Sequence, residues 1–241
     1  MLLRLADLPA GLAGPNDATY NGKVPTRARF LFPEAAQSLC GLEAASGGLV
    51  YTDVFRSADA SLAACRNKRG CQRPAFSAHN FGLAFDLDLD ATKKKLQLTY
   101  QGLTSLLNRF GWYCHRRDGN PDEMESWHFN FLGEQAGTYL TLATEVHKTW
   151  SAPVETRIAE LYGADFLLTP VQLQQALEQA HFYYGAIDGL QGPLTYEAIR
   201  AFQRAWQIEE SPVKPGGTTH RTLAYVTADR VIEPKEAGLN V

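Results

Sequence analysis

Apolar and acidic residues alternate between Leu83 and Asp90 in the run LAFDLDLD. A period of two residues is typical of a half-buried strand, so the pattern predicts a strand at this position. Asp86, Asp88 and Asp90 would then project from one face of the strand, where their mutual repulsion favours a cation nearby. The identity of that cation is the first question that the sequence raises.

The first half of the chain, up to about Trp150, mixes strand-like and helical stretches. The run GGLVYTDVF is strand-like, whereas PEAAQSLCGLEAA and TYQGLTSLLNRFG have helical character. An interleaving of both kinds is typical of an α+β domain. We therefore predict an α+β fold for residues 1–150, followed by a linker over residues 151–166.

The second half of the chain has helical patterning. We expect a helix from Thr169, with Pro170 in its first turn. Its apolar stripe consists of Val171, Leu173, Ala176, Leu177 and Ala180. A turn that contains Gly and Pro follows, then the helices TYEAIRAFQRAWQI and TTHRTLAYV. This order predicts an all-α three-helix bundle over residues 167–228 and a C-terminal tail over residues 229–241.

Composition and charge restrict the possible partners. The chain has 241 residues, of which 45% are hydrophobic, and a formal net charge of -3, which is ordinary for a soluble globular protein. This charge gives no general attraction for nucleic acid or an anionic membrane. Arg4, Asp7 and Pro9 interrupt the apolar N-terminus, so we expect no signal peptide and no membrane insertion. A monomer is the expected state.

The four cysteines are Cys40, Cys65, Cys71 and Cys114. They are too few for a disulfide scaffold in a chain of this length, so free buried thiols are the default expectation. Cys65 and Cys71 flank RNKRG and could close a small loop in an oxidising environment, but the sequence does not set the distance between them.

Two histidines and two carboxylates form a pattern that suits a zinc ion. His79 and Asp86 are seven residues apart, and the later run EMESWHFNF supplies Glu125 and His128. Two imidazoles and one carboxylate make an open zinc site with a fourth position for water. Glu125 is the natural base for the proton of that water, which predicts metal-assisted hydrolysis. A lone histidine is more often structural, so the prediction depends on the order of the whole set.

The order of these residues forms a motif. It reads SAHNFGLAFD from Ser77 to Asp86 and ESWH from Glu125 to His128. The motif resembles that of the VanY-like D-alanyl-D-alanine carboxypeptidase family, which also includes L-alanyl-D-glutamate endopeptidases of phage lysis enzymes. The resemblance covers roughly residues 30–131. It implies an α+β zinc peptidase domain with a small antiparallel sheet and flanking helices.

The resemblance also implies a role for each matching residue. One zinc ion would be bound by His79, Asp86 and His128, and Glu125 would act as general base and acid. The run DVFRSADAS matches the upstream Arg-Ser element of the family, which makes Arg56 the expected contact of a substrate carboxylate or an oxyanion.

Ser77 has two possible roles at the start of the AHNFG turn. It either hydrogen-bonds the substrate or the groups around the metal, or it caps the turn.

Asp88 and Asp90 have no assigned place in the zinc site. The run DLDLDATKKKLQ partly matches a calcium loop, but Ala91 stands where that loop needs Gly and Gln97 replaces its bidentate Glu. We expect Asp88 to orient a metal ligand or to bind substrate amines. We expect Asp90 at the surface, balanced by the lysines at positions 93–95.

The second half resembles a second family. Its LQQAL helix, the run GAIDGLQGPLTYEAIRAFQ and the closing helix occur in order over roughly residues 167–226. These features resemble the peptidoglycan-binding domain type 1 module of cell-wall hydrolases, which implies bacterial peptidoglycan as the partner. A helical bundle used only for packing is the alternative.

Both resemblances imply the same polymer. They predict a peptidoglycan hydrolase that cuts a peptide bond of the stem peptide or the cross-link. We expect a phage or prophage endolysin, made in the cytoplasm and acting on the wall in the periplasm after holin-type or secretion-system release. The alternatives are a secreted antibacterial effector, a D-Ala-D-Ala carboxypeptidase and a noncatalytic wall-binding protein. The choice of bond depends on loops around Arg56 and Arg116.

Overall fold

The chain forms two compact units that are not continuous in sequence. The structure, a computed structural model, describes residues 2–5, 24, 28–67, 72–114, 125–133, 155–156, 158–159 and 166–232. The second unit combines Ala58–Phe76 with Gly163–Glu233, and the rest of the chain forms the first unit. We expected a single boundary near residue 150. In the structure, Ala58–Phe76 from the first half of the sequence clusters with the second unit instead. The expected linker falls mostly outside the described residues.

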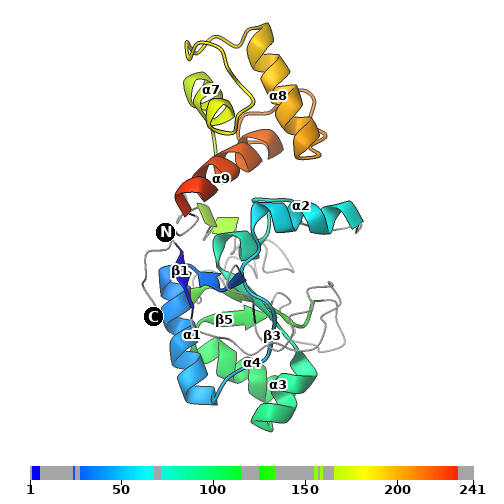
Figure 1. The fold of residues 1–241 in the computed structure, drawn as a ribbon. Coiled ribbons are helices and arrows are strands. Elements are labelled where there is room, and N and C mark those ends of the chain that lie inside the picture. Colours follow the sequence, from blue (N-terminus) through cyan, green and yellow to red (C-terminus); the bar gives the residue numbers. More distant parts are fainter. Residues whose placement is uncertain are drawn as a thin grey trace. The chain divides into compact units, whose positions relative to one another are not determined.

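A four-stranded antiparallel sheet lies at the centre of the first unit (Figure 1). Its strands, in spatial order, are β3 (Tyr51–Asp53), β4 (Ala84–Leu87), β6 (His128–Phe131) and β5 (Trp112–Cys114). A separate two-stranded sheet pairs β1 (Leu3–Arg4) with β2 (Phe30–Leu31). The prediction of a small antiparallel sheet is confirmed.

Helices accompany this sheet in the first unit, as expected. They are α1 (Pro33–Ser46), the one-turn 3-10 helix η2 (Ala78–Phe81), α3 (Leu89–Leu96) and α4 (Tyr100–Arg109). Pro33 occupies the first position of α1, where its missing N–H costs nothing. Thr99 caps α4 by accepting a hydrogen bond from the N–H of Gly102 at 3.1 Å.

Aromatic side chains form the core on one face of the sheet. Phe85 of β4 packs against Phe129 of β6 with ring centroids 5.8 Å apart. The fully buried Trp112 of β5 packs on Phe85 at 4.3 Å. Successive strand residues point to opposite faces, so burial of this aromatic pair turns Asp86 and His128 towards the other face.

The strand predicted between Leu83 and Asp90 is shorter than expected, because β4 ends at Leu87. Asp88 instead caps α3, and its side chain accepts a hydrogen bond from the N–H of Ala91 at 2.9 Å. The prediction that Asp88 shares a strand face with Asp86 is therefore wrong, since the capping bond starts a helix there.

Asp90 lies in the first turn of α3. Its side chain is 95% exposed, and Lys93 Nζ lies 3.0 Å from its Oδ1. The expected surface position beside a lysine is confirmed for Asp90.

The cysteines only partly follow the expectation of free buried thiols. Cys65 is disulfide-bonded, so that expectation is wrong at this position. Cys40 and Cys114 are free, but Cys40 is exposed and only Cys114 is buried. Cys71 lies outside the described residues.

The described helices of the second unit include those predicted from the sequence. They are α2 (Ala58–Asn67), α7 (Pro170–Gln179), α8 (Pro193–Ala205) and α9 (Thr218–Ile232). Helix α9 continues past residue 228, so the expected tail begins later. None of the helices in the described part of the chain has the length and apolar character needed to cross a membrane.

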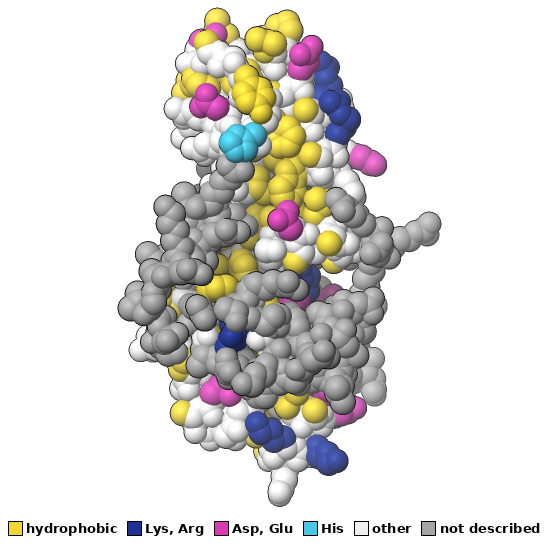
Figure 2. Space-filling model, in the orientation of Figure 1, with side chains coloured by type: hydrophobic (Ala, Val, Ile, Leu, Met, Phe, Trp, Pro, Cys, Tyr) yellow, Lys and Arg dark blue, Asp and Glu magenta, His cyan; other side chains and the backbone are white. Residues whose placement is uncertain are grey.

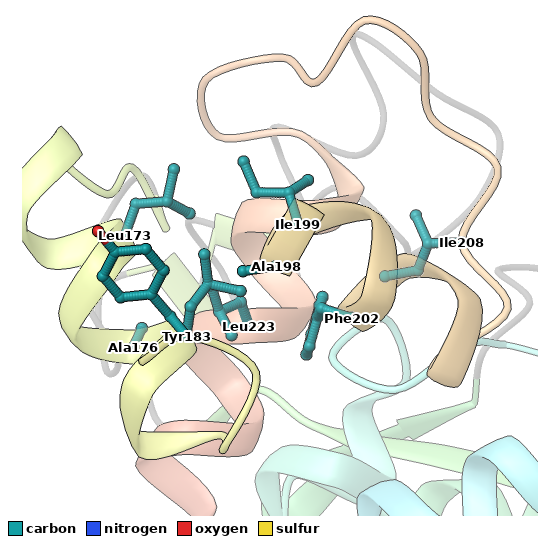
Figure 3. Packing of buried hydrophobic residues seen from close by; sticks show 9 residues of the cluster. Leu173, Ala176, Tyr183, Ala198, Ile199, Phe202, Ile208 and Leu223 are labelled. Carbon is teal, nitrogen blue, oxygen red and sulfur yellow. The ribbon is translucent and has the colours of Figure 1, made fainter. Parts of the chain in front are cut away.

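Helices α7, α8 and α9 share one apolar core (Figure 3). Its buried members are Leu173, Ala176, Leu177, Tyr183, Ala198, Ile199, Phe202, Ile208 and Leu223. Val171, which was expected in the apolar stripe of α7, is 41% exposed. Removal of this apolar surface from water is the main force that holds the helical module together.

Contacts with α9 explain why Ala58–Phe76 belongs to the second unit. Arg221 of α9 donates from Nε to the carbonyl of Ala75 at 2.6 Å. Its guanidinium lies over the ring of Phe76 at 4.5 Å and over the ring of Phe166 at 4.9 Å, which is cation–π geometry. These contacts tie a stretch of the first half of the sequence to a helix of the second half.

A buried glutamine holds the GAIDG turn against α7. Gln174 is fully buried, and its Nε2 donates to Asp188 Oδ1 at 2.9 Å and to the carbonyl of Leu190 at 3.0 Å. Its Oε1 accepts from the N–H of Gly189 at 2.8 Å. Asp188 Oδ1 also accepts from the N–H of Leu190 at 2.9 Å. The Asp-Gly pair of the motif therefore has a structural role in this module.

Gln174→Leu should destabilise the helical module by about 1–3 kcal/mol, because the part-buried N–H of Gly189 loses its acceptor and the buried hydroxyls of Tyr183 and Thr195 lose a donor. Gln175→Leu, at the neighbouring exposed position of α7, is the matched control and should change stability little. Scanning calorimetry of the full chain measures both effects. Equal effects of the two substitutions would contradict the role given to Gln174.

Acid should weaken the same turn. The hydrogen bond from Gln174 and then that from Leu190 hold the pKa of Asp188 below its ordinary value. A lowered carboxyl pKa contributes stability that is present above the unfolded-state pKa and is lost as pH falls through the folded-state pKa.

The melting temperature of the module should therefore fall between about pH 5 and about pH 2 more steeply in the wild type than in Asp188→Asn. Identical pH profiles in the two proteins would show that the Asp188 carboxylate does not support the turn.

Candidate metal centre

Three side chains from three elements meet at one point of the first unit. His79 comes from η2, Asp86 from β4 and His128 from β6, and Asp86 and His128 are paired across the two strands. His79 Nε2 lies 3.2 Å from Asp86 Oδ1 and 3.1 Å from His128 Nδ1. His128 Nδ1 lies 2.8 Å from Asp86 Oδ1. The structure thus brings together the three residues that the sequence predicted as metal ligands.

The outer nitrogen of each imidazole has its own partner. His79 Nδ1 lies 2.7 Å from the carbonyl of Val54, which can only accept, so this nitrogen carries the hydrogen. His128 Nε2 lies 3.0 Å from Asn130 Oδ1 and donates to it in the same way. The other nitrogen of a neutral imidazole then carries a lone pair. When neutral, as metal ligands are, both histidines therefore direct a lone pair at the group that contains Asp86.

Electron-rich atoms this close together favour a cation between them. In a tetrahedral site with metal–ligand distances of about 2.0–2.2 Å, neighbouring ligand atoms lie about 3.3–3.6 Å apart. The separations among the three candidate ligand atoms here, 2.8, 3.1 and 3.2 Å, are somewhat shorter, so small shifts of the side chains would admit the ion. Two imidazole nitrogens and a carboxylate oxygen are donors that zinc accepts. The residues therefore fit a zinc ion held by three protein ligands.

Burial and charge act in opposite directions on the groups at this site. Burial lowers the pKa of His79, but the charges of Asp86 and Asp53 outweigh it and raise that pKa above its ordinary value. Burial by itself would raise the pKa of Asp86, yet His79 and His128 hold it well below its ordinary value. Asp86 is therefore a carboxylate at neutral pH, which is the charge state that a metal ligand needs.

A second charged pair borders this group. Arg56 donates to Asp53 Oδ2 from Nε at 3.0 Å and from Nη2 at 2.5 Å. The backbone of Arg56 is tied to η2, because its N–H donates to the carbonyl of His79 at 3.3 Å and its carbonyl accepts from Asn80 Nδ2 at 2.7 Å. The positive charge of Arg56 also acts to lower the pKa of His79. Arg56 is thus a cation held beside the predicted ligands.

Glu125 and Ser77 lie just before the elements that carry ligands. Glu125 has a left-handed φ of 68°, and its carbonyl accepts from the N–H of His128 at 3.0 Å. Ser77 is buried before η2, where its N–H donates to Asn80 Oδ1 at 3.3 Å. These contacts of Ser77 are typical of a helix start. The roles of Glu125 as base and of Ser77 as substrate contact stay predictions, and Arg116 lies outside the described residues.

Sequence reasoning missed the groups that orient the predicted ligands and Arg56. Asn130 stands two residues after His128 on one strand, so the two side chains share a face, and this period-two signal could have identified it. Asp53 stands three residues before Arg56, and no sequence pattern indicates that the two side chains pair. The carbonyl of Val54 acts through the main chain, which a side-chain pattern does not reveal.

Comparison with known proteins bears mainly on the second half. Residues 170–211 match the family described as "Putative peptidoglycan binding domain", which confirms the predicted module over that stretch. A solved structure of the LdcB LD-carboxypeptidase, which reveals the molecular basis of peptidoglycan recognition, is similar to this chain with 18% identity and a TM-score of 0.41. The likeness covers 62% of this chain and 81% of that chain. No curated protein matches the chain.

Substitutions at His128 and Asn130 should weaken zinc binding to different degrees. His128→Ala removes a ligand and should abolish high-affinity binding. Asn130→Ala keeps all three ligands but no longer orients the imidazole of His128, so zinc affinity should fall about 10- to 100-fold.

Competition with a chromophoric chelator measures zinc affinity in the full chain. Asn108→Ala, at an exposed position of α4, is the matched control and should bind zinc like the wild type. Wild-type affinity in Asn130→Ala would contradict the orienting role of this residue.

Proposed function

We propose that this chain is a zinc-dependent peptidase that hydrolyses a peptide bond of bacterial peptidoglycan. The observation that carries the proposal is the convergence of His79 Nε2, Asp86 Oδ1 and His128 Nδ1, with no pair more than 3.2 Å apart. The order of these residues and Glu125 resembles the motif of the VanY-like peptidases. The family match over residues 170–211 supports peptidoglycan as the substrate.

His79, Asp86 and His128 would hold the metal through two nitrogens and one oxygen. When bound, Zn²⁺ supplies Lewis acidity, which activates a water molecule and polarises a carbonyl group. Structural zinc sites are closed by four protein ligands, whereas catalytic sites keep one position open. Within the described residues, the group contains these three ligands and no fourth His, Cys, Asp or Glu. A three-ligand site favours a catalytic role over a noncatalytic wall-binding protein.

Glu125 would move the proton during hydrolysis. Its carboxylate would take a proton from the attacking water and deliver it to the amine that leaves when the peptide bond breaks. A left-handed φ of 68° at a residue other than glycine costs roughly 1–3 kcal/mol, and such conformations cluster at functional sites. The strained backbone at Glu125 therefore supports a functional reason for its position.

Arg56 would bind a carboxylate of the substrate or the oxygen that becomes negative during attack. Its contacts with Asp53 hold the guanidinium in a defined orientation. A fixed cation stabilises developing negative charge without reorganising during the reaction. Ser77 is kept as a candidate substrate contact at the start of η2.

The helical module would keep the enzyme on its insoluble substrate. Attachment through a second site raises the effective concentration of the catalytic unit near the bonds that it cuts. This gives the two units a common purpose. A peptidase of small soluble peptides would have no use for a module that binds the wall.

The proposed biological role is that of a phage or prophage endolysin, which reaches the wall after holin-type release. A lytic enzyme must cut connections that carry load, which favours an endopeptidase over a carboxypeptidase. An antibacterial effector released by a secretion system would use the same chemistry. A neighbouring holin gene or immunity gene separates these two roles.

Purified sacculi incubated with the zinc-loaded wild type should release products with new amino and carboxyl termini, which mass spectrometry identifies together with the bond that is cut. Glu125→Gln should retain zinc and wall binding but lose at least about 100-fold in turnover, because the proton acceptor is gone while the ligands remain. His128→Ala should lose zinc and turnover together.

Turnover of Glu125→Gln near the wild-type rate would contradict the assigned base. Absence of new termini from the zinc-loaded wild type, with wall binding retained, would favour a binding protein instead.

A further inference from the structure

A depression of about 470 Å³ lies on the surface of the helical module. One side is formed by the segment Phe182–Gly185, which follows α7, and the other side by α8. The residues from α8 are Leu194, Glu197, Ala198, Arg200, Ala201 and Arg204. All of these residues fall within the stretch that matches the peptidoglycan-binding family, and none belongs to the metal centre.

The apolar part of this depression is an exposed and well-supported aromatic surface. Tyr184 is 82% exposed and Leu194 is 62% exposed, although both are large hydrophobic side chains. The hydroxyl of Tyr184 donates to the carbonyl of His181 at 2.8 Å, which fixes the tip of the ring. A Cβ atom at Gly185 would lie 2.6 Å from the hydroxyl oxygen of Tyr183, so this position needs glycine. The segment thus offers a defined aromatic face to a ligand.

The polar part of the depression consists of charges on α8. Arg200 and Arg204 stand four residues apart, so they lie on the same face of the helix. Both are exposed, and within the described part of the chain neither makes an ion pair. Basic side chains beside hydrophobic ones are visible on this module in Figure 2. These two guanidinium groups are available for an anionic ligand.

The chemistry of the depression favours a ligand with uncharged sugar rings and attached groups that carry a few carboxylates. Guanidinium groups bind carboxylates through two parallel hydrogen bonds, and an aromatic face packs against the apolar face of a ring. Residues 166–232 contain five Lys and Arg against six Asp and Glu, so the module has no overall attraction for a polyanion such as nucleic acid. The depression itself has two arginines against the one carboxylate of Glu197, so its positive charge is local and matches a ligand of local negative charge.

We propose that this depression is the surface through which the module binds peptidoglycan. Tyr184 packs against a sugar ring of the glycan strand, and Arg200 and Arg204 bind carboxylates of the attached stem peptide. The inference rests on the proposed function, which names the polymer but assigns no binding surface on the module.

Binding of full-length protein to purified sacculi tests this assignment, with Glu125→Gln as the background so that hydrolysis does not remove the ligand. Adding Arg200→Glu or Arg204→Glu should raise the apparent Kd in co-sedimentation at least about tenfold, since a charge-assisted contact becomes a repulsion. Tyr184→Ala should weaken binding by a similar factor.

Two matched controls separate these effects from general changes of the surface. Lys214→Glu reverses an exposed cation outside the depression, and Tyr196→Ala removes a tyrosine of α8 that is 48% exposed and does not line it. Both controls should bind sacculi like the background protein. Circular dichroism and melting temperature establish that each variant is folded.

A chemical control tests the ligand group. Sacculi whose carboxyl groups have been converted to amides should bind the background protein as weakly as native sacculi bind the arginine variants. Unchanged binding of amidated sacculi would overturn the carboxylate assignment.

The outcomes distinguish this inference from the proposed function. If the background protein does not bind native sacculi, the proposed function of the module fails. If it binds them and the three depression variants bind equally well, or the two controls lose as much affinity, the assigned surface is wrong while wall binding stands.

Discussion

The register between β4 and β6 is the constraint on which the candidate metal centre depends. It places Asp86 directly opposite His128, and the neighbouring pair is Phe85 opposite Phe129. Because side chains alternate along a strand, a slip of one residue would turn Asp86 into the aromatic core and Phe85 out of it. Burial of the aromatic pair therefore fixes the position of the polar pair. The hydrophobic effect on one face of the sheet sets the ligand geometry on the other face.

The third predicted ligand, His79, reaches the same point through a tight turn. Gly82 follows η2 with a φ of 65°, and its carbonyl accepts from the N–H of Phe32 at 2.9 Å. A Cβ atom at this position would lie 2.7 Å from the backbone nitrogen of Phe32, so another residue would displace the end of η2 from the segment that follows β2. The glycine between His79 and Asp86 thus helps to fix the turn that carries His79, because it allows the end of η2 to pack closely against the backbone at Phe32.

The sequence predicted the antiparallel sheet and the helices of the module, and it singled out the three side chains that converge in the structure, because each depends on local period or ordered spacing. The strand prediction was wrong at Asp88. The alternation of apolar and acidic residues continues past this position in the sequence, but a capping hydrogen bond from the N–H of Ala91 starts a helix there. Local pattern also does not reveal that Ala58–Phe76 clusters with the second unit, because the contacts of this stretch with Arg221 join residues that are far apart in the sequence. The nitrogen that each histidine offers depends on a carbonyl and on Asn130, and spacing alone does not specify it.

The residues that identify the module in the sequence differ from the residues proposed to bind its ligand. Gln174, Asp188 and Gly189 direct hydrogen bonds to one another and hold the turn that makes the motif recognisable. Polar groups that are already hydrogen-bonded within the protein have fewer positions left for a ligand. This part of the motif therefore indicates the fold more than it indicates the binding chemistry. Arg200 and Arg204 lie outside that turn and are exposed. In the proposed binding mode, substitution of these arginines changes which ligand the module binds. It leaves the helical framework intact, because the core is made of apolar residues and does not depend on their charge.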